Sequence, residues 1–162
     1  MDTLKPVKAS NRQPDLPLGL PVETVMRRGI GIWKIAAGFN TSEFTGDTSR
    51  DEVWNRGAYL VQGPGHCAEC HTPRNWIMAP DKSRWLAGGP HPEGSGNVPS
   101  LRSLKARKRF KDAKDLATAL EFGETLGYDK MSSGGMAAVQ TNMSKLPAED
   151  RMAIANYLMS LE

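Results

Sequence analysis

Both cysteines of the chain and two of its three histidines lie in one short stretch, GPGHCAECHTPRN at residues 63–75. Cys67 and Cys70 are three residues apart, so on one turn of helix their sulfur atoms point to the same side. His71 is four residues from Cys67 and shares that side. Two thiols can add to the two vinyl groups of a porphyrin while the adjacent imidazole binds its iron. The C-x-x-C-H motif therefore predicts a covalently bound haem.

Three other kinds of site use the same residue types and remain open. A redox-active dithiol also has the C-x-x-C spacing, but it occurs beside a βαβ pattern that this sequence lacks. A zinc site needs four ligands, so the two cysteines would have to recruit histidines from among His66, His71 and His91. A disulfide between the two cysteines would close a very short loop and add little stability. The motif favours haem over all three.

The composition is that of one soluble globular domain with much irregular chain. The 162 residues can bury a core without disulfides, and the 16 glycines and 11 prolines indicate long loops around a few helices. The net charge is only +3. The best candidate for a membrane span, residues 29–39, is too short and contains Lys34. The sequence as it stands therefore predicts neither a membrane span nor an export signal.

The helix that must position the motif is predicted directly before it. Ser49 and Glu52 form a capping box at its start, and Gly63 with Pro64 ends it. The apolar residues between them recur with helical spacing and share one face. The motif is therefore expected to follow the end of this helix.

Two further helices are predicted after the motif, which makes the fold class all-α. One spans residues 113–122 with Asp112 as its cap, and the other begins near Pro147 and continues to the end of the chain. Residues 79–100 and 123–145 are rich in glycine and are predicted to be loops. No segment alternates in the way that a strand requires.

Longer strings resemble one family of haem proteins. From residue 51 to 161 the sequence is similar to class I c-type cytochrome domains, with Gly57 as a small residue at a helix crossing and Tyr157 in a last helix. The strings WNRGAYLVQGPGHCAECHTPRN, RWLAGG, GGMAAV and LPAEDRMAIANYLMSL further resemble the cytochrome subunits of periplasmic alcohol, aldehyde and gluconate dehydrogenases. The resemblance implies a helical fold wrapped around one covalently bound haem c, in a periplasmic protein.

The same resemblance implies roles for single residues. It implies thioether links at Cys67 and Cys70 and ligation of the iron by His71. The carbonyl of Pro99 should accept a hydrogen bond from the other ring nitrogen of that histidine, which fixes the ring and raises its basicity. Trp85 and Arg84 are two more candidates for contact with the haem or with one of its propionates. Trp85 suits the core equally well.

Two methionines are candidates for the sixth ligand of the iron. Met136 follows the flexible pair Gly134–Gly135 and aligns with the family's methionine, although this chain has Gly135 where the family pattern has proline. Met131 follows two charged residues, which are costly to place beside a buried porphyrin. We therefore predict Met136, with Met131 as the alternative.

These features predict an electron carrier and not an enzyme. The iron would cycle between Fe(II) and Fe(III), and the sequence offers no nucleophile with its base, no phosphate loop and no paired carboxylates. One alternative is a haem peroxidase or gas sensor with an open sixth position. Another is an interaction module of a dehydrogenase complex whose haem only relays electrons. The expected partners are redox proteins, among them a dehydrogenase subunit or a preceding haem domain.

A run of basic residues is the strongest charge feature. Residues 102–114 contain seven lysines and arginines and one acidic residue, Asp112, which gives a local balance of +6. Such a run is usually a solvated face, and nucleic acid is not expected to bind an exported haem protein. Close to the haem, the run would steer an acidic partner toward the domain.

The N-terminal part is predicted to be separate from the haem domain. Residues 1–20 are rich in proline, and an apolar spacing from Val22 to Phe39 indicates a helix or a half-buried arm. We therefore divide the chain into a linker or arm at 1–45 and a cytochrome domain at 46–162. The opening MDTLKPVKASNRQ resembles the tail of a haem domain, so we expect the arm to bridge from a preceding one.

Overall fold

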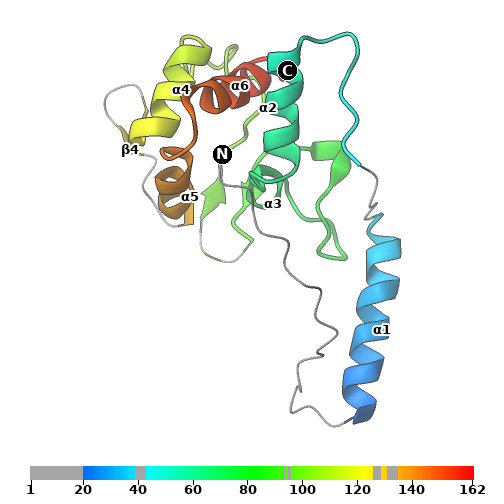
Figure 1. Ribbon diagram of the computed structural model, residues 1–162. Coiled ribbons are helices and arrows are strands. Elements are labelled where there is room, and N and C mark those ends of the chain that lie inside the picture. Colours follow the sequence, from blue (N-terminus) through cyan, green and yellow to red (C-terminus); the bar gives the residue numbers. More distant parts are fainter. Residues whose placement is uncertain (1–19, 39–42, 93, 95, 126–128, 131–134) are drawn as a thin grey trace. The chain divides into compact units, whose positions relative to one another are not determined.

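The chain divides into two units, which are described separately. The computed structural model describes residues 20–38, 43–92, 94, 96–125, 129–130 and 135–162. The unit Met1–Asn40 contains helix α1 (Leu20–Ala36), which covers most of the segment predicted as a helix or arm. The unit Thr41–Glu162 contains the other described elements (Figure 1).

The second unit is built mainly of α-helices, so the all-α prediction is confirmed. They are α2 (Glu52–Gln62), α3 (Cys67–His71), α4 (Ala113–Phe122), α5 (Gly135–Met143) and α6 (Ala148–Met159), with a 3-10 turn η1 (Lys82–Arg84). The described strands form two short antiparallel pairs, β1 (Gly89–Pro90) with β2 (Asn97–Val98) and β3 (Glu124–Thr125) with β4 (Asp129–Lys130). These strands were not predicted, because two residues are too few to show alternation.

Helices α2 and α6 cross in close contact at Gly57 (Figure 1). A β-carbon on Gly57 would lie 2.0 Å from the backbone oxygen of Ala153 and 2.8 Å from the β-carbon of Tyr157. Because no side chain fits into this space, only glycine allows the two helices to approach so closely. The crossing thereby fixes the direction of α2.

Polar and aromatic contacts join the same two helices on either side of the crossing. The guanidinium of Arg56 donates two hydrogen bonds to the carboxylate of Asp150, at 2.7 and 2.9 Å. This pairing holds the pKa of Asp150 below its usual range. The indole of Trp54 packs edge-to-face on Tyr157, with ring centroids 5.0 Å apart, and its N–H donates to the hydroxyl of Ser160. Both ends of α6 are therefore tied to α2.

The start of α2 differs from the prediction. Its cap is Asp51, whose carboxylate accepts a hydrogen bond from the backbone N–H of Trp54 at 2.7 Å. Ser49 instead donates its N–H and its hydroxyl to the carboxylate of Asp47. The predicted capping box of Ser49 and Glu52 is therefore wrong, because an aspartate next to the helix is an equally good cap.

Helix α4 begins and ends as predicted. The carboxylate of Asp112 accepts a hydrogen bond from the N–H of Asp115 at 2.9 Å, and Gly123 ends the helix in the left-handed conformation with φ 75°. Helix α6 follows Pro147, also as predicted. Together with α2, these two helices enclose the core, in which Val61 and Leu86 are fully buried.

Helix α5 lies in a segment that was predicted to be a loop, so that prediction is wrong for residues 135–143. The segment contains good helix formers, such as Ala137 and Gln140, directly after its glycines. The side chain of Gln140 donates a hydrogen bond to the backbone oxygen of Glu121, at 2.8 Å, near the end of α4. A long-range contact of this kind stabilises the helix and leaves no local signal.

In the part of the chain that the structure describes, no helix is long and apolar enough to cross a membrane.

Replacing Gly57 with alanine should destabilise the second unit by about 1–3 kcal/mol or more, because the added methyl group meets backbone that cannot move aside. Thermal unfolding followed by circular dichroism measures this loss. Gly31→Ala in α1 is the matched control, since a β-carbon there meets nothing within 4 Å. A melting temperature of Gly57→Ala equal to that of the unmodified protein would contradict the close crossing.

Candidate functional site

The motif forms a single helical turn directly after α2. Helix α3 contains both thiols and the imidazole, as the spacing predicted. The N–H of Gly65 donates to the backbone oxygen of Leu60 at 2.8 Å, and a β-carbon on Gly65 would lie 2.5 Å from that oxygen. His66 then adopts the left-handed conformation, with φ 51°, at the start of α3. The end of α2 therefore sets the direction of the helix that carries the motif.

The two thiols lie in different environments. Cys67 is partly buried, and this burial raises the pKa of its thiol to about 11. Cys70 is exposed, and both cysteines are free. The attacking cysteine of a redox-active dithiol has a lowered pKa, so the environment of Cys67 does not favour that alternative.

The histidines do not complete a zinc site with the thiols. Among the described residues, no group of three or more histidine, cysteine, aspartate and glutamate side chains is placed to hold a metal ion. The ring of His66 is exposed instead and lies 2.9 Å from the carboxylate of Glu69. The zinc alternative therefore has no support from this geometry.

The imidazole of His71 is buried, with 8% of the residue exposed. Its Nδ1 lies 2.7 Å from the backbone oxygen of Pro99, which is the hydrogen bond expected from the resemblance. Burial lowers the pKa of His71, and the bond to Pro99 opposes this effect in part. The ring is therefore neutral near pH 7 and donates through Nδ1, so a metal would bind at Nε2.

Backbone hydrogen bonds from residues 86–101 hold the chain around the end of α3. The N–H of Gly88 donates to the backbone oxygen of His71 at 2.7 Å. The buried hydroxyl of Thr72 accepts the N–H of Leu86 at 3.0 Å, and the oxygen of Leu86 accepts the N–H of Leu101. None of these three contacts was predicted; the sequence signals for the segment were the string RWLAGG and Pro99.

The predicted residues Arg84 and Trp85 lie at the end of η1. Arg84 is exposed, and its Nε donates to the carboxylate of Asp81 at 2.8 Å. Trp85 is partly buried and packs against the core, which is one of the two roles left open for it. That Arg84 or Trp85 contacts a haem stays a prediction.

The structure describes only one of the two candidate sixth ligands. Met136 is partly buried in the first turn of α5, where a loop had been predicted. Met131, the alternative, lies outside the described residues. The choice between the two methionines stays a prediction.

Comparison with known proteins identifies relatives along nearly the whole chain. It is 44% identical over 158 residues to a protein from Cereibacter sphaeroides named diheme cytochrome c-type. It is 36% identical over 164 residues to the fructose dehydrogenase cytochrome subunit of Gluconobacter japonicus. It is 34% identical over 169 residues to the cytochrome c subunit of the quinone-dependent alcohol dehydrogenase of Gluconacetobacter polyoxogenes. The chain is homologous to c-type cytochromes.

The alignments cover nearly all of this chain but only part of each relative. They include 98%, 99% and 99% of this chain, but 50%, 32% and 35% of the three relatives, so the chain spans half of their length or less. No protein-family model matches the chain. The names describe cytochrome subunits rather than catalytic subunits, which agrees with the prediction of an electron carrier. The helical second unit agrees with a cytochrome c-like fold.

The donor set in α3 fits a c-type haem. Two free thiols and a buried neutral imidazole lie on one helical turn, and the imidazole is already fixed through Nδ1. These are the groups that thioether formation and iron ligation require. The fit rests on this chemistry and on the orientation of His71.

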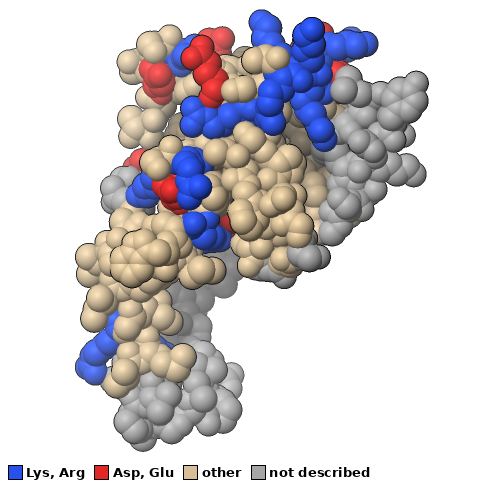
Figure 2. All heavy atoms as spheres, turned by 180° about the vertical axis from the view of Figure 1, so that it is seen from behind, with Lys and Arg blue, Asp and Glu red and all other residues tan. Residues whose placement is uncertain are grey.

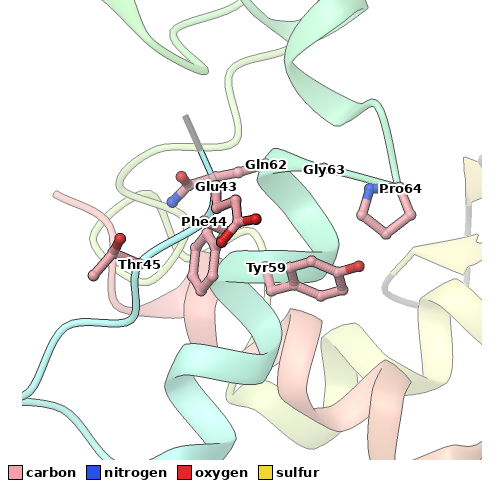
Figure 3. Close-up of a pocket in the computed structure, with 7 residues that line it drawn as sticks. All are labelled: Glu43, Phe44, Thr45, Tyr59, Gln62, Gly63 and Pro64. Carbon is pink, nitrogen blue, oxygen red and sulfur yellow. The ribbon is translucent and has the colours of Figure 1, made fainter. Parts of the chain in front are cut away.

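A surface pocket of about 610 Å³ borders the motif without containing any of the predicted site residues (Figure 3). It lies between the segment before α2 and the C-terminal end of α2. The rings of Phe44 and Tyr59 meet edge-to-face in its wall, with centroids 5.6 Å apart. Its lining residues are Glu43, Phe44, Thr45, Tyr59, Gln62, Gly63 and Pro64.

Proposed function

We propose that the second unit is an electron-transfer domain with one haem c, bound through thioether links to Cys67 and Cys70. His71 binds the iron through Nε2. The observation that carries this proposal is the hydrogen bond from His71 to Pro99, which leaves the correct nitrogen available on the same helical turn as both thiols. When bound, the haem supplies an iron that alternates between Fe(II) and Fe(III).

The protein's own contribution is to fix and shield the proximal side of the site. The carbonyl oxygen of Pro99 accepts a hydrogen bond from Nδ1–H of His71 and thereby raises the basicity of the ligand. Burial of His71 keeps the ring neutral and limits the access of water. Electron transfer then needs no substrate site, because one electron arrives from a donor and the same electron leaves to an acceptor.

Expression together with haem-attachment machinery should give a protein whose mass exceeds that of the chain by one haem, even after denaturation, because thioether links are covalent. Mass spectrometry of the denatured protein is the measurement. The variant in which Cys67 and Cys70 are both alanine should lose the haem under these conditions, while Met78→Ala should keep it. Free thiols and an unchanged mass in the unmodified protein would refute the proposal.

Met136 is our proposed sixth ligand of the iron. It is partly buried at the start of α5, and its sequence context resembles the methionine-bearing loop of c-type cytochromes, except that Gly135 stands where that pattern has proline. A neutral, soft thioether sulfur favours Fe(II) and therefore raises the reduction potential. This assignment is independent of haem attachment. Met136 can prove not to be the ligand while the proposal of a covalent haem still holds.

Replacing Met136 with alanine should abolish the methionine-to-iron charge-transfer absorption and lower the reduction potential. Axial ligands set haem potentials over a range of about 0.8 V, so the shift should be easy to measure. Redox titration followed by visible spectroscopy tests both changes, and Met131→Ala is the matched control. The reverse pattern would assign the ligand to Met131, and no effect of either variant would support an open sixth position.

The relatives suggest where the electrons come from. Two of them are named as cytochrome subunits of fructose and alcohol dehydrogenases. By similarity, this chain would relay electrons from a dehydrogenase to the next carrier. Covalent haem attachment in an oxidising, exported compartment is consistent with a periplasmic location.

The basic run gives this domain a surface for an acidic redox partner. Its side chains are exposed, and Figure 2 shows lysine and arginine side chains gathered at the top of that view. Arg107 anchors the segment by donating to the backbone oxygens of Ser100 and Arg102. Ser100 follows the residue that holds His71, so the run starts on the same stretch of chain. The seven basic residues are Arg102, Lys105, Arg107, Lys108, Arg109, Lys111 and Lys114.

Association with the physiological partner should slow as salt rises, because salt screens the attraction between opposite charges. Stopped-flow electron transfer at several ionic strengths measures this. Lys105→Gln combined with Lys108→Gln should slow the reaction several-fold at low salt. Lys82→Gln combined with Lys145→Gln removes the same charge elsewhere and should have less effect. Rates that do not depend on salt would mean that the run is only a solvated face.

A further inference from the structure

One end of the β1–β2 hairpin binds both the backbone and the ring of His71. Gly89 pairs with Val98 in the hairpin, so the next residues outward are Gly88 and Pro99. The N–H of Gly88 donates to the backbone oxygen of His71, and the oxygen of Pro99 accepts from its ring, each at 2.7 Å. The hairpin therefore presents a donor and an acceptor, side by side, to one residue.

Gly88 lies tightly against the other arm of this hairpin. A β-carbon there would lie 2.5 Å from the backbone nitrogen of Ser100, 2.6 Å from the oxygen of Val98 and 2.7 Å from the carbonyl carbon of Pro99. Gly88 also has φ 73°, which disfavours any side chain. A side chain at this position would push against the peptide whose oxygen binds His71.

A second contact, made by the residue that follows His71, fixes the same segment. The hydroxyl of Thr72, which is 2% exposed, accepts the N–H of the fully buried Leu86 at 3.0 Å. Leu86 has φ 57°, a conformation that is unfavourable for leucine and needs support from its surroundings. The oxygen of Leu86 in turn accepts the N–H of Leu101. Thr72 therefore connects the end of α3 to both arms that lead into the hairpin.

We propose that Gly88 and Thr72 are positioning residues that set the strength of the His71–Pro99 hydrogen bond and thereby the reduction potential of the domain. This proposal rests on the proposed function, because it needs His71 to be an iron ligand. Neither residue touches the iron in this mechanism. Each acts by fixing the position of the Pro99 carbonyl.

The expected sign follows from the chemistry of the ligand. A strong hydrogen bond from Nδ1–H to a carbonyl makes the imidazole more basic. A more basic ligand stabilises Fe(III) relative to Fe(II), which lowers the potential. Loosening the contact between His71 and Pro99 should therefore raise the potential. This shift is opposite in sign to the one expected when a methionine ligand is removed.

The first test compares Gly88→Ala with Gly96→Ala in the haem-loaded protein. Gly96 lies in the same hairpin at φ 94°, but a β-carbon there meets nothing within 4 Å. Both variants therefore place alanine at positive φ, and only Gly88→Ala displaces the Pro99 peptide. Redox titration should show an upward shift for Gly88→Ala and little change for Gly96→Ala. Proton NMR should show a weaker hydrogen bond at Nδ1–H of His71.

The second test uses Thr72, so that the proposal can be decided even when Gly88→Ala does not fold. Thr72→Val keeps the shape of the side chain but leaves the buried N–H of Leu86 without its acceptor. It should raise the potential in the same direction. Thr72→Ser keeps the hydroxyl and loses only the methyl group, so its potential should stay at that of the unmodified protein. A shift in Thr72→Ser as large as that in Thr72→Val would mean that packing of the side chain, and not the hydrogen bond to Leu86, sets the potential.

The outcomes separate this proposal from the proposed function. An unmodified protein that never acquires covalent haem would overturn the function itself. Folded, haem-loaded Gly88→Ala and Thr72→Val proteins with unchanged potentials and unchanged Nδ1–H resonances would overturn the positioning role alone. A shift in Gly96→Ala as large as that in Gly88→Ala would overturn it as well.

Discussion

The close crossing of α2 and α6 at Gly57 is the constraint on which the rest of the second unit depends. Because the two backbones meet where no β-carbon fits, α2 has one position relative to α6. The bonds from Arg56 to Asp150 and from Trp54 to Ser160 add direction to this contact. The end of α2, and with it the start of the motif helix, is thereby placed by an element more than eighty residues away.

A short series of backbone contacts connects the end of α2 to the imidazole of His71. The bond from Gly65 to Leu60 forces the chain to turn directly into α3. The hairpin then holds the other end of α3 through His71. The motif turn is therefore fixed at both ends by main-chain hydrogen bonds, which do not depend on long, mobile side chains.

The sequence allowed α2, α4, α6 and the motif to be predicted, but neither α5 nor the contacts that hold the site together. Asp112 and the periodic apolar residues after it defined α4, because caps and helical spacing are local signals. At α2 the same rules chose Ser49 over Asp51, since both residue types are good caps and the two residues lie only two positions apart. The contacts of Gly88 and Thr72 join segments that are far apart in sequence, so no local pattern reveals them.

The two sides of the proposed iron site are held by different means. His71 is fixed by backbone atoms of a hairpin whose spacing is set by the ladder between Gly89 and Val98. Met136 lies on α5, whose side-chain contact with α4 is made through Gln140. A change on one side therefore need not disturb the other. In the proposed site, a more basic imidazole would favour Fe(III) and the thioether of Met136 would favour Fe(II), so the potential would reflect a difference between two separately supported ligands. Under this proposal, substitutions in the hairpin would adjust the potential while every ligand stays in place.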